Sequence, residues 1–312
     1  MDQKEKTFFH YDARLAFWMM LPIVVIVLSL VIIPVLWNLW LSFKEVSLED
    51  LREISLFSFH PTSTNFVKVF SDPDFLPVLV TTLIYTVFGS ALSVFLGLGA
   101  ALLVHGDFAG RKVLRGLLIS PYIAPIVAVT FTWSFILDPQ LGVINWLLVD
   151  QGLLAKPIPF LSQRFWNLDL FGISIRFPLA LTMVVLFEGW RYFPFAFLFV
   201  LARLQAIPNE LYRAASVDGA SPIQQFRHIT LPQLASVLST LFLFRFIWTL
   251  NKFDDIFLLT SGQSGTKVLT IKVYEYAFGE FDIGASSAAA MVLFGILALF
   301  LFLYFQFFSK EN

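Results

Sequence analysis

The chain has 312 residues, of which 58% are hydrophobic and 14% charged, and its mean hydropathy is +0.78. This balance lies outside the range of soluble domains and indicates a polytopic membrane protein. The formal net charge of −1 and the lack of basic runs argue against a nucleic-acid partner, and the lack of cysteine excludes disulfides and thiolate chemistry.

Six apolar stretches follow one another, and each is long enough for a bilayer crossing, which needs about 20 helical residues. We predict an all-α fold with six transmembrane helices at residues 16–43, 78–104, 117–137, 178–204, 234–260 and 283–308. The first stretch is too long for a signal-peptide core and lacks a small-residue cleavage site, so we expect it to stay uncleaved. In the sequence, a short segment at residues 1–15 then precedes a transmembrane domain at 16–308, and a short tail at 309–312 follows it.

Glycines and prolines modify two of these spans. The second contains small residues that let neighbouring helices approach closely, namely Gly89, Gly97 and Gly99. Pro121 and Pro125 interrupt the third span, and such prolines are tolerated only where protein or water satisfies the freed carbonyls. They favour a bundle interior or a cavity lining. The connection that follows is expected to include a short helix around residues 143–149.

A polar stretch at residues 205–232 separates the fourth and fifth spans and is predicted to form two short helices that meet at a glycine. Gly219 suits the left-handed position that ends a helix, and Ser221-Pro222 provides a cap and a first-turn proline for the next. The second helix is expected to stop before Pro232, because the residue before a proline is pushed out of the α region. The two helices would form a compact knob.

The knob resembles the EAA loop of binding-protein-dependent ABC importer permeases, whose pattern is roughly Glu-Ala-Ala, three residues, Asp-Gly-Ala and, after a gap, Ile-Thr-Leu-Pro. The matching positions are Ala214, Ala215, Asp218, Gly219, Ala220, Phe226, Ile229, Thr230, Leu231 and Pro232. Arg213 stands where the family usually has its first Glu, which puts in doubt an ion pair with the ATPase, and Glu210 lies one turn earlier as a substitute. The alternative interpretation is an ordinary cytoplasmic helical hairpin.

This resemblance implies a set of residues that couple the chain to an ATPase. They are Glu210, Arg213, Ala214, Ala215, Asp218, Gly219, Ala220, Phe226 and Pro232. In the family this loop faces the cytoplasm. The density of Lys and Arg in the short segments on the same side as the termini also places both termini in the cytoplasm, although the two sides carry similar numbers of basic residues.

Charged residues inside the fourth and fifth spans are the second informative feature, because each costs about 2.5–3.5 kcal/mol at a helix centre and so normally faces a partner or a cavity. Glu188 and Arg191 share one helix face. A stripe at positions i, i+3, i+4 and i+7 is formed by Arg245, Trp248, Thr249 and Lys252. Aromatic, hydroxyl and cationic groups together suit a sugar. The alternative is that the arginines pair with Glu188, Asp254 or Asp255 and join helices.

Two further segments resemble sugar-importer permeases of the maltose type: Trp248-Thr249-Leu250-Asn251-Lys252-Phe253-Asp254 with the following residues 256–260, and Glu188-Gly189-Trp190-Arg191 with Pro194-Phe195. In that group the fifth-span helix lines the sugar site. The resemblance implies a substrate pathway of Glu188, Trp190, Arg191, Arg245, Trp248, Thr249 and Lys252.

Taken together, the resemblance implies the permease subunit of a type I ABC importer, a multi-pass protein of the cell (inner) membrane. Its expected partners are a second homologous permease subunit in a heterodimer, two ABC ATPase subunits, an extracytoplasmic solute-binding protein, a carbohydrate and the lipid bilayer. The chain lacks a Gly-x-x-x-x-Gly-Lys-Ser/Thr loop, so no catalytic residue and no cofactor are expected in it, and ATP and Mg are expected on the ATPase. The scattered histidines predict no metal site.

Two alternatives remain open at this point. An anionic solute, such as a glycerol phosphodiester or an acidic oligosaccharide, would use the three cations at 191, 245 and 252, unless nearby carboxylates neutralise them. A secondary transporter would need inverted repeats and a carboxylate near mid-membrane in each half. Glu188 is the only acidic residue well inside a predicted span. A purely structural membrane subunit is a further possibility.

Overall fold

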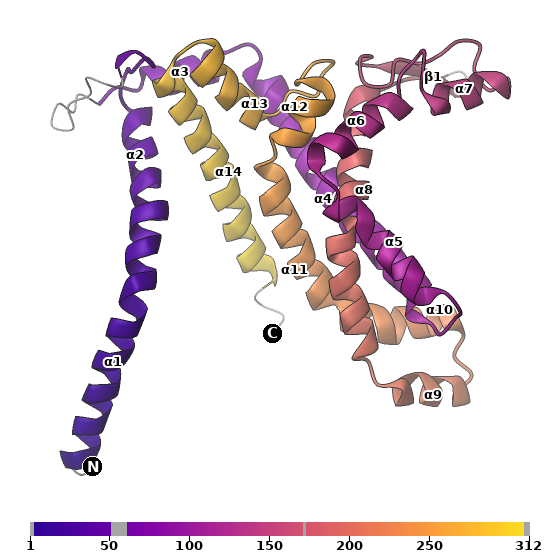
Figure 1. Ribbon diagram of the computed structural model, residues 1–312, viewed down its shortest axis with the longest axis horizontal. Coiled ribbons are helices and arrows are strands. Elements are labelled where there is room, and N and C mark those ends of the chain that lie inside the picture. Colours follow the sequence, from indigo (N-terminus) through magenta and orange to yellow (C-terminus); the bar gives the residue numbers. More distant parts are fainter. Residues whose placement is uncertain (1–2, 51–60, 171–172, 309–312) are drawn as a thin grey trace. The chain divides into compact units, whose positions relative to one another are not determined.

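The computed structural model describes residues 3–50, 61–170 and 173–308, and most of them are helical (Figure 1). The chain forms two compact units, one of Met1–Asp72 with Val273–Phe294 and the other of Pro73–Lys272 with Gly295–Asn312. Within the described residues, five helices are long and apolar enough to cross a membrane, and a bent pair would provide a sixth. The predicted polytopic helical fold is confirmed.

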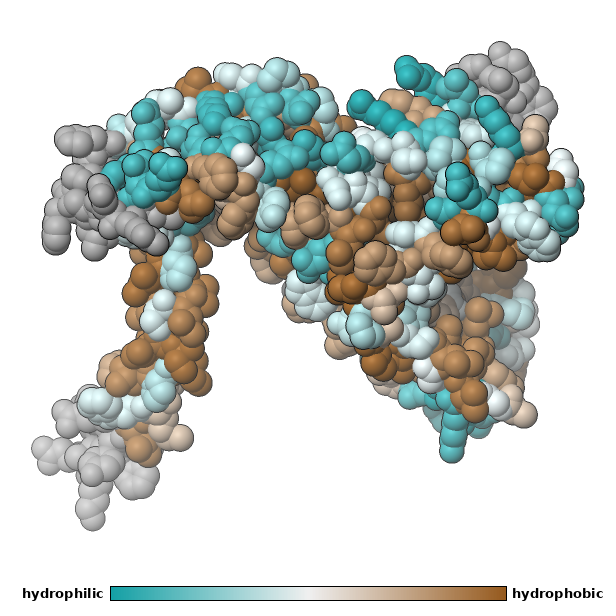
Figure 2. All heavy atoms as spheres, turned by 45° about the horizontal axis from the view of Figure 1, so that its top comes forward, coloured by the Kyte–Doolittle hydropathy of each residue, from teal (hydrophilic) through white to brown (hydrophobic). Residues whose placement is uncertain are grey.

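The first unit begins with a long apolar helix in three sections. They are α1 (Gln3–Val27), the π-helical turn η1 (Leu28–Ile32) and α2 (Ile33–Ser42). The π turn ends two residues before Pro34, and such a wide turn can absorb a residue that lacks an N–H. The helix starts well before the predicted residue 16. Within its membrane-length part, Leu15–Ser42, the apolar window contains no buried residue, and it shows as a brown column in Figure 2.

Polar contacts close the other end of this unit. The elements here are α3 (Thr64–Ser71), the π turn η4 (Glu275–Gly279) and the first half of α14 (Ile283–Phe308). The Lys68 ammonium lies 2.8 Å from a carboxylate oxygen of Glu280 and 2.8 Å from one of Asp282. Partial burial disfavours the charged amine, but hydrogen bonds and the charges of Asp282 and Glu280 outweigh it and raise the pKa of Lys68. These contacts tie α3 to the start of α14.

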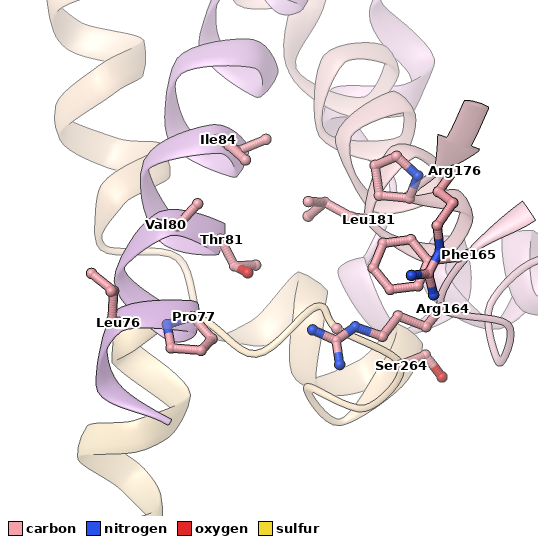
Figure 3. A pocket seen from close by; sticks show the side chains of 12 residues that line it. Leu76, Pro77, Val80, Thr81, Ile84, Arg164, Phe165, Arg176, Leu181 and Ser264 are labelled. Atoms are coloured by element: carbon pink, nitrogen blue, oxygen red, sulfur yellow. The ribbon is translucent and has the colours of Figure 1, made fainter. Parts of the chain in front are cut away.

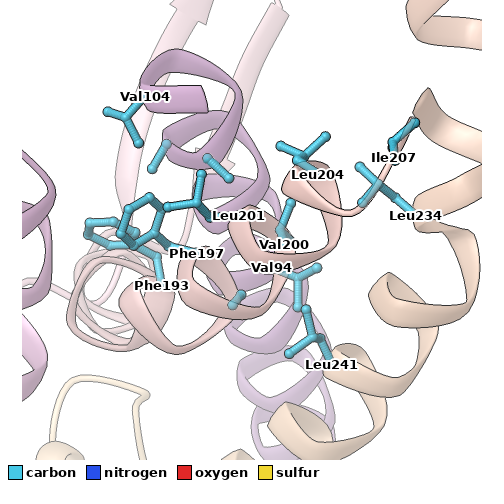
Figure 4. Close-up of a cluster of buried hydrophobic side chains, with 13 residues drawn as sticks. Val94, Val104, Phe193, Phe197, Val200, Leu201, Leu204, Ile207, Leu234 and Leu241 are labelled. Carbon is cyan, nitrogen blue, oxygen red and sulfur yellow. The ribbon is translucent and has the colours of Figure 1, made fainter. Parts of the chain in front are cut away.

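Three helices form the centre of the second unit. They are α4 (Phe75–His105), α8 (Leu179–Gln205) and α11 (Leu231–Leu250). Side chains from all three meet in one buried cluster, in which Val94, Phe197 and Leu241 come from the three helices in turn (Figure 4). Lipid tails are as apolar as leucine, so close packing rather than exclusion of water must hold such helices together.

Glycines allow α4 and α8 to pack at short range. A Cβ at Gly97 would lie 2.6 Å from the Cβ of Ala196, and one at Gly189 would lie 2.5 Å from the side chain of Leu92. The close approach predicted for Gly97 is confirmed. Gly99 differs, because a Cβ there would meet nothing within 4 Å. It therefore has no part in this contact.

The interruption predicted in the third span is a sharp bend. Helix α5 (Arg111–Ile123) and α6 (Ile126–Ile136) meet at 97°, so residues 117–137 do not form one straight helix. Pro125 precedes α6, and the residue before a proline avoids the helical region. The Arg191 guanidinium donates to the freed carbonyls of Pro121 and Ala124, each at 3.0 Å. The expectation that protein satisfies these carbonyls is confirmed.

The fifth span differs from the prediction at both ends. Helix α10 (Pro222–Gln225) continues through the π turn η3 (Phe226–Thr230) into α11, so the second knob helix does not stop before Pro232. The π turn makes this possible, because it widens the helix just before the proline. At the other end α11 stops at Leu250, and α12 (Asp254–Thr260) is a separate short helix with two aspartates in its first turn, where negative charge is favourable.

The segments that connect the long helices contain the remaining elements. They are α7 (Val143–Asp150), β1 (Trp166–Leu170), β2 (Ile173–Phe177), α9 (Asn209–Val217) and α13 (Leu269–Tyr274). The short helix predicted around 143–149 is confirmed as α7. The antiparallel hairpin of β1 and β2, in which Trp166 pairs with Phe177, was not predicted.

Replacing Gly97 with Ala tests the packing of α4 on α8. The added methyl group would collide with Ala196 and the backbone of Phe197, and we expect the variant to lose about 1–3 kcal/mol of stability, the usual cost of overpacking. The measurement is thermal unfolding of the purified chain in detergent. Gly99→Ala in the same helix is the control and should unfold at or above the parent temperature. Equal behaviour of the two variants would contradict the packing.

Candidate functional site

A buried ionic cluster lies where α4, α8 and α11 meet. Glu188 and Arg245 form an ion pair, and both side chains are almost completely inaccessible. The Glu188 carboxylate also accepts hydrogen bonds from the hydroxyls of Tyr85 at 2.8 Å and Thr249 at 2.7 Å. The Arg245 guanidinium donates to the hydroxyl of Ser93 at 3.1 Å. Each charged group of the pair is thus hydrogen-bonded as well as paired.

Tyr192 connects this pair to a second group of charges. The side-chain cations of Lys252 and Arg245 lie 4.0 Å and 4.4 Å from the centre of its ring, and that of Arg191 lies at 5.5 Å. Such cation–π contacts gain strength where water is excluded. The Tyr192 hydroxyl donates to Asp255 at 2.9 Å and accepts from Lys252, whose amine lies 3.4 Å from the same carboxylate.

The predicted stripe on the fifth span is therefore divided. Arg245 and Thr249 face Glu188 and are buried, whereas Trp248 remains 41% exposed. Lys252 lies beyond the end of α11, where Asp255 and not the helix surface fixes its position. The structure brings three of the predicted pathway residues into direct contact, namely Glu188, Arg245 and Thr249, and Arg191 and Lys252 are joined to them through Tyr192. Trp248 is not part of that cluster.

Trp190 lies elsewhere and is half-buried among other aromatic rings. Its ring centre is 5.4 Å from that of Trp133 and 6.4 Å from that of Phe187. Tyr85, Ser93 and Tyr192 are members of the cluster that sequence reasoning missed. On α4 a signal was present, because the polar and small residues between 85 and 93 recur at helical spacing within an apolar span.

Beside Trp248 lies a separate groove of about 200 Å³, which we call the aromatic groove, and Trp248 contacts two of its lining residues. It is lined by Phe195, Phe199, Ser236, Val237, Thr240, Leu241 and Phe244. The Trp248 ring lies edge-on to Phe195 at 4.9 Å and parallel to Phe244 at 5.8 Å between ring centres. Ser236, Thr240, Phe244 and Trp248 are four residues apart along α11, a regular helical face that could have revealed the groove.

The knob is a rigid turn between α9 and α10. Gly219 adopts the left-handed conformation, with φ of +81°, which allows the chain to reverse without strain. Ser221 and Gln224 form a reciprocal capping box at the start of α10. The side chain of Gln225 bridges back to the hydroxyl of Ser216 at 2.9 Å, and Tyr212 bonds Thr230 at 2.9 Å. Both cross-links fix α9 against the following helix.

The predicted coupling residues are distributed over this turn. Ala215, Asp218, Gly219 and Ala220 line a groove of about 310 Å³ on the knob. Glu210, Arg213 and Ala214 are exposed on α9, Phe226 is half-buried in η3, and Pro232 is exposed at the start of α11. Val217 and Ile223, which were not in the predicted set, are 88% and 79% exposed. These are the two most exposed large apolar side chains of the knob.

Comparison with known proteins gives consistent matches over most of the chain. Residues 93–310 match the family model described as "Binding-protein-dependent transport system inner membrane component". The chain is 35% identical over 286 residues to the inner membrane ABC transporter permease protein YcjO of Escherichia coli, covering 92% of this chain and 91% of that protein. It is 31% identical over 300 residues to the trehalose/maltose transport system permease protein MalF of Thermococcus litoralis, covering 95% and 94%.

A solved structure shares the fold. It comes from a bacterial ABC transporter involved in the import of the acidic polysaccharide alginate, and it matches with a TM-score of 0.78 over 100% of both chains. The sequence identity is 20%, so this likeness concerns the arrangement of the helices.

The buried ion pair can be tested by removing one or both of its members. Glu188→Gln leaves the Arg245 charge without a carboxylate, and we expect a loss of about 3–5 kcal/mol of stability, typical of a broken buried pair. The double variant Glu188→Gln with Arg245→Met should recover most of it, because neither charge remains. Chemical unfolding in mixed micelles provides the measurement, with the exposed Arg227→Gln as a control that changes little. A double variant no more stable than Glu188→Gln would contradict the pairing.

Proposed function

The chain belongs to the family of binding-protein-dependent transport system inner membrane components, and on this premise we propose that it is the permease subunit of an ATP-driven importer that brings a carbohydrate into the cell. The observation that carries the proposal is the knob, a rigid exposed turn at the end of the second unit remote from α7 and β1 (Figure 1). It offers apolar and small side chains to a partner at a place where the described chain has nothing to cover them.

The partner proposed for the knob is an ABC ATPase subunit, which would bind ATP and Mg. We place the knob and both termini in the cytoplasm, in agreement with the density of basic residues in the short segments on that side. Two ATPase subunits, a second homologous permease subunit and an extracytoplasmic solute-binding protein would complete the importer. Closure of the ATPase would push the knob, and the continuous helix through η3 and α11 would carry that movement into the membrane.

A neutral sugar fits the charge arrangement better than an anionic solute. Arg245 is paired with Glu188, Lys252 interacts with Asp255, and Arg191 binds backbone carbonyls. These internal partners occupy the three cations that an anion would need. The name of the Thermococcus litoralis relative, a trehalose/maltose permease, points to the same class of substrate.

Within the membrane, we propose the aromatic groove as the surface along which the sugar passes. Sugar rings stack on aromatic faces, and their hydroxyls need hydrogen-bond partners of the kind that Ser236 and Thr240 offer. Trp248 is the predicted pathway residue that borders this groove, and Lys252 is the partly exposed polar group beyond the end of α11. The role of the buried residues is then to position the helices that form the groove. These residues are Glu188, Arg191, Arg245 and Thr249.

Reconstitution in proteoliposomes tests the function. Uptake of a labelled neutral disaccharide should require the ATPase subunits, ATP and the solute-binding protein. Uptake that continues without the ATPase would favour a secondary transporter and overturn the proposal, and preferred uptake of an anionic oligosaccharide would overturn the neutral substrate.

In that assay, Gly219→Asp should abolish transport and the coupling of ATP hydrolysis to it. The substitution places a charged side chain at the tip of the knob and strains a left-handed residue. The matched control is Gly152→Asp, because Gly152 also has a positive φ, of +71°, and open space around it, but lies in the loop after α7. Membrane insertion of both variants should be normal. Normal uptake by the Gly219 variant would contradict docking of the knob.

Trp248→Ala should raise the KM for transport about tenfold, the effect of losing roughly 1–2 kcal/mol of ring contact with a sugar. The ATPase activity of the importer without substrate should stay near the parent value. Trp146→Ala is the control, because Trp146 is 63% exposed on α7 and does not line the groove. An unchanged KM in Trp248→Ala would argue against the aromatic groove as the pathway.

A further inference from the structure

A second pocket, of about 520 Å³, lies at the first turns of α4, at the end of the unit remote from the knob (Figures 1 and 3). Two arginines, Arg164 and Arg176, line one side of it together with Phe165. The first turns of α4 form the facing wall, through Val80 and Ile84. No residue of the ionic cluster or the aromatic groove takes part.

Both guanidinium groups lie close to the same aromatic ring. The central guanidinium carbon of Arg164 lies 5.1 Å from the ring centre of Phe165, and that of Arg176 lies 4.7 Å from it. The backbone at Gly265 confines Arg164, since a Cβ there would lie 2.9 Å from its Nε. Among the described residues, neither arginine has a carboxylate within ion-pair distance. Both positive charges are therefore available to a ligand, in contrast to those of Arg245 and Lys252.

The opposite wall is apolar and belongs to a membrane span. Leu76, Val80 and Ile84 follow each other at four-residue intervals on one face of α4, and they are 64%, 47% and 38% exposed. They lie within Phe75–His105, which is long and apolar enough to cross the bilayer. The pocket thus joins a cationic end to a hydrocarbon-like wall at the level where a span begins, close to the lipid headgroups.

We propose that this pocket binds an anionic glycerophospholipid. The phosphate would lie between Arg164 and Arg176, because a guanidinium matches phosphate geometry with paired hydrogen bonds. One acyl chain would run along Leu76, Val80 and Ile84. A free phosphate would contact only the two arginines and leave the apolar wall uncovered. A second protein subunit would cover the apolar wall but would not supply the negative charge that a lipid phosphate brings to the two arginines. The proposal does not depend on the nature of the transported solute.

Lipid binding to the purified full-length chain tests this proposal, with phosphatidylglycerol and phosphatidylcholine compared by native mass spectrometry. Phosphatidylglycerol should be retained preferentially, and Arg164→Gln with Arg176→Gln should weaken its binding about tenfold or more, the effect of losing charged hydrogen bonds. Lys156→Gln, an exposed charge in the same connection, should bind like the parent. Equal binding of the two lipids by the parent chain, or parent-like binding by the double variant, would overturn the site.

Two further arms distinguish the occupants. Val80→Trp fills the pocket from an exposed position without changing its charge, and it should also weaken phosphatidylglycerol binding; no effect would overturn the acyl-chain placement. Competition by inorganic phosphate as strong as by the lipid would reveal a simple anion site instead. Because the chain has no cysteine, Val80→Cys provides a single label, and its cross-linking to the second permease subunit in the assembled importer would show that protein occupies this face.

Discussion

The ion pair between Glu188 and Arg245 depends on the close approach of α4 to α8. The packing of the three central helices of the second unit depends in turn on the ion pair and on this close approach. Taking two charges away from water is costly, and a buried pair is stable only when further hydrogen bonds satisfy its remaining donors and acceptors. Tyr85, Ser93 and Thr249 provide those bonds from two helices. Gly89 makes room, because a Cβ there would lie 2.8 Å from the Cγ of Glu188. Small residues and charges therefore act together: the first bring the helices near, and the second fix their register.

The same requirement explains the bend between α5 and α6. A proline in a membrane leaves a carbonyl without its N–H partner, and an unsatisfied carbonyl in hydrocarbon is expensive. Arg191 supplies two donors to the carbonyls of the bend, so one side chain of α8 stabilises a neighbouring broken helix. Tyr192, the next residue, links the ion pair to Lys252 and Asp255 at the start of α12. Movement of α8 would therefore be transmitted to several elements at once and not to one alone.

Sequence reasoning predicted the helical class, the position of most spans, the knob and the polar residues of the fourth and fifth spans. It succeeded where one local rule decides the outcome, as at Gly219, whose left-handed turn requires glycine. It failed where partners distant in the chain decide. The helix through Pro232 continues because a π turn absorbs the proline, and the stripe of 245, 248, 249 and 252 divides because α8 buries only part of it. Periodicity shows which residues share a face, but not which neighbour covers that face.

Charge gives the clearest case of this limit. In the sequence, the cations at 191, 245 and 252 leave an anionic substrate open as an alternative to a neutral sugar. In the structure Arg245 is paired with Glu188, whereas Arg164 and Arg176 lie close to Phe165 and line a pocket at the beginning of a span. The cations of the buried cluster therefore stabilise the packing of the helices, whereas Arg164 and Arg176 line a pocket that a ligand could enter. The proposed binding of an anionic lipid and the proposed import of a neutral sugar are consequently compatible, because the lipid would contact arginines that the ionic cluster does not use.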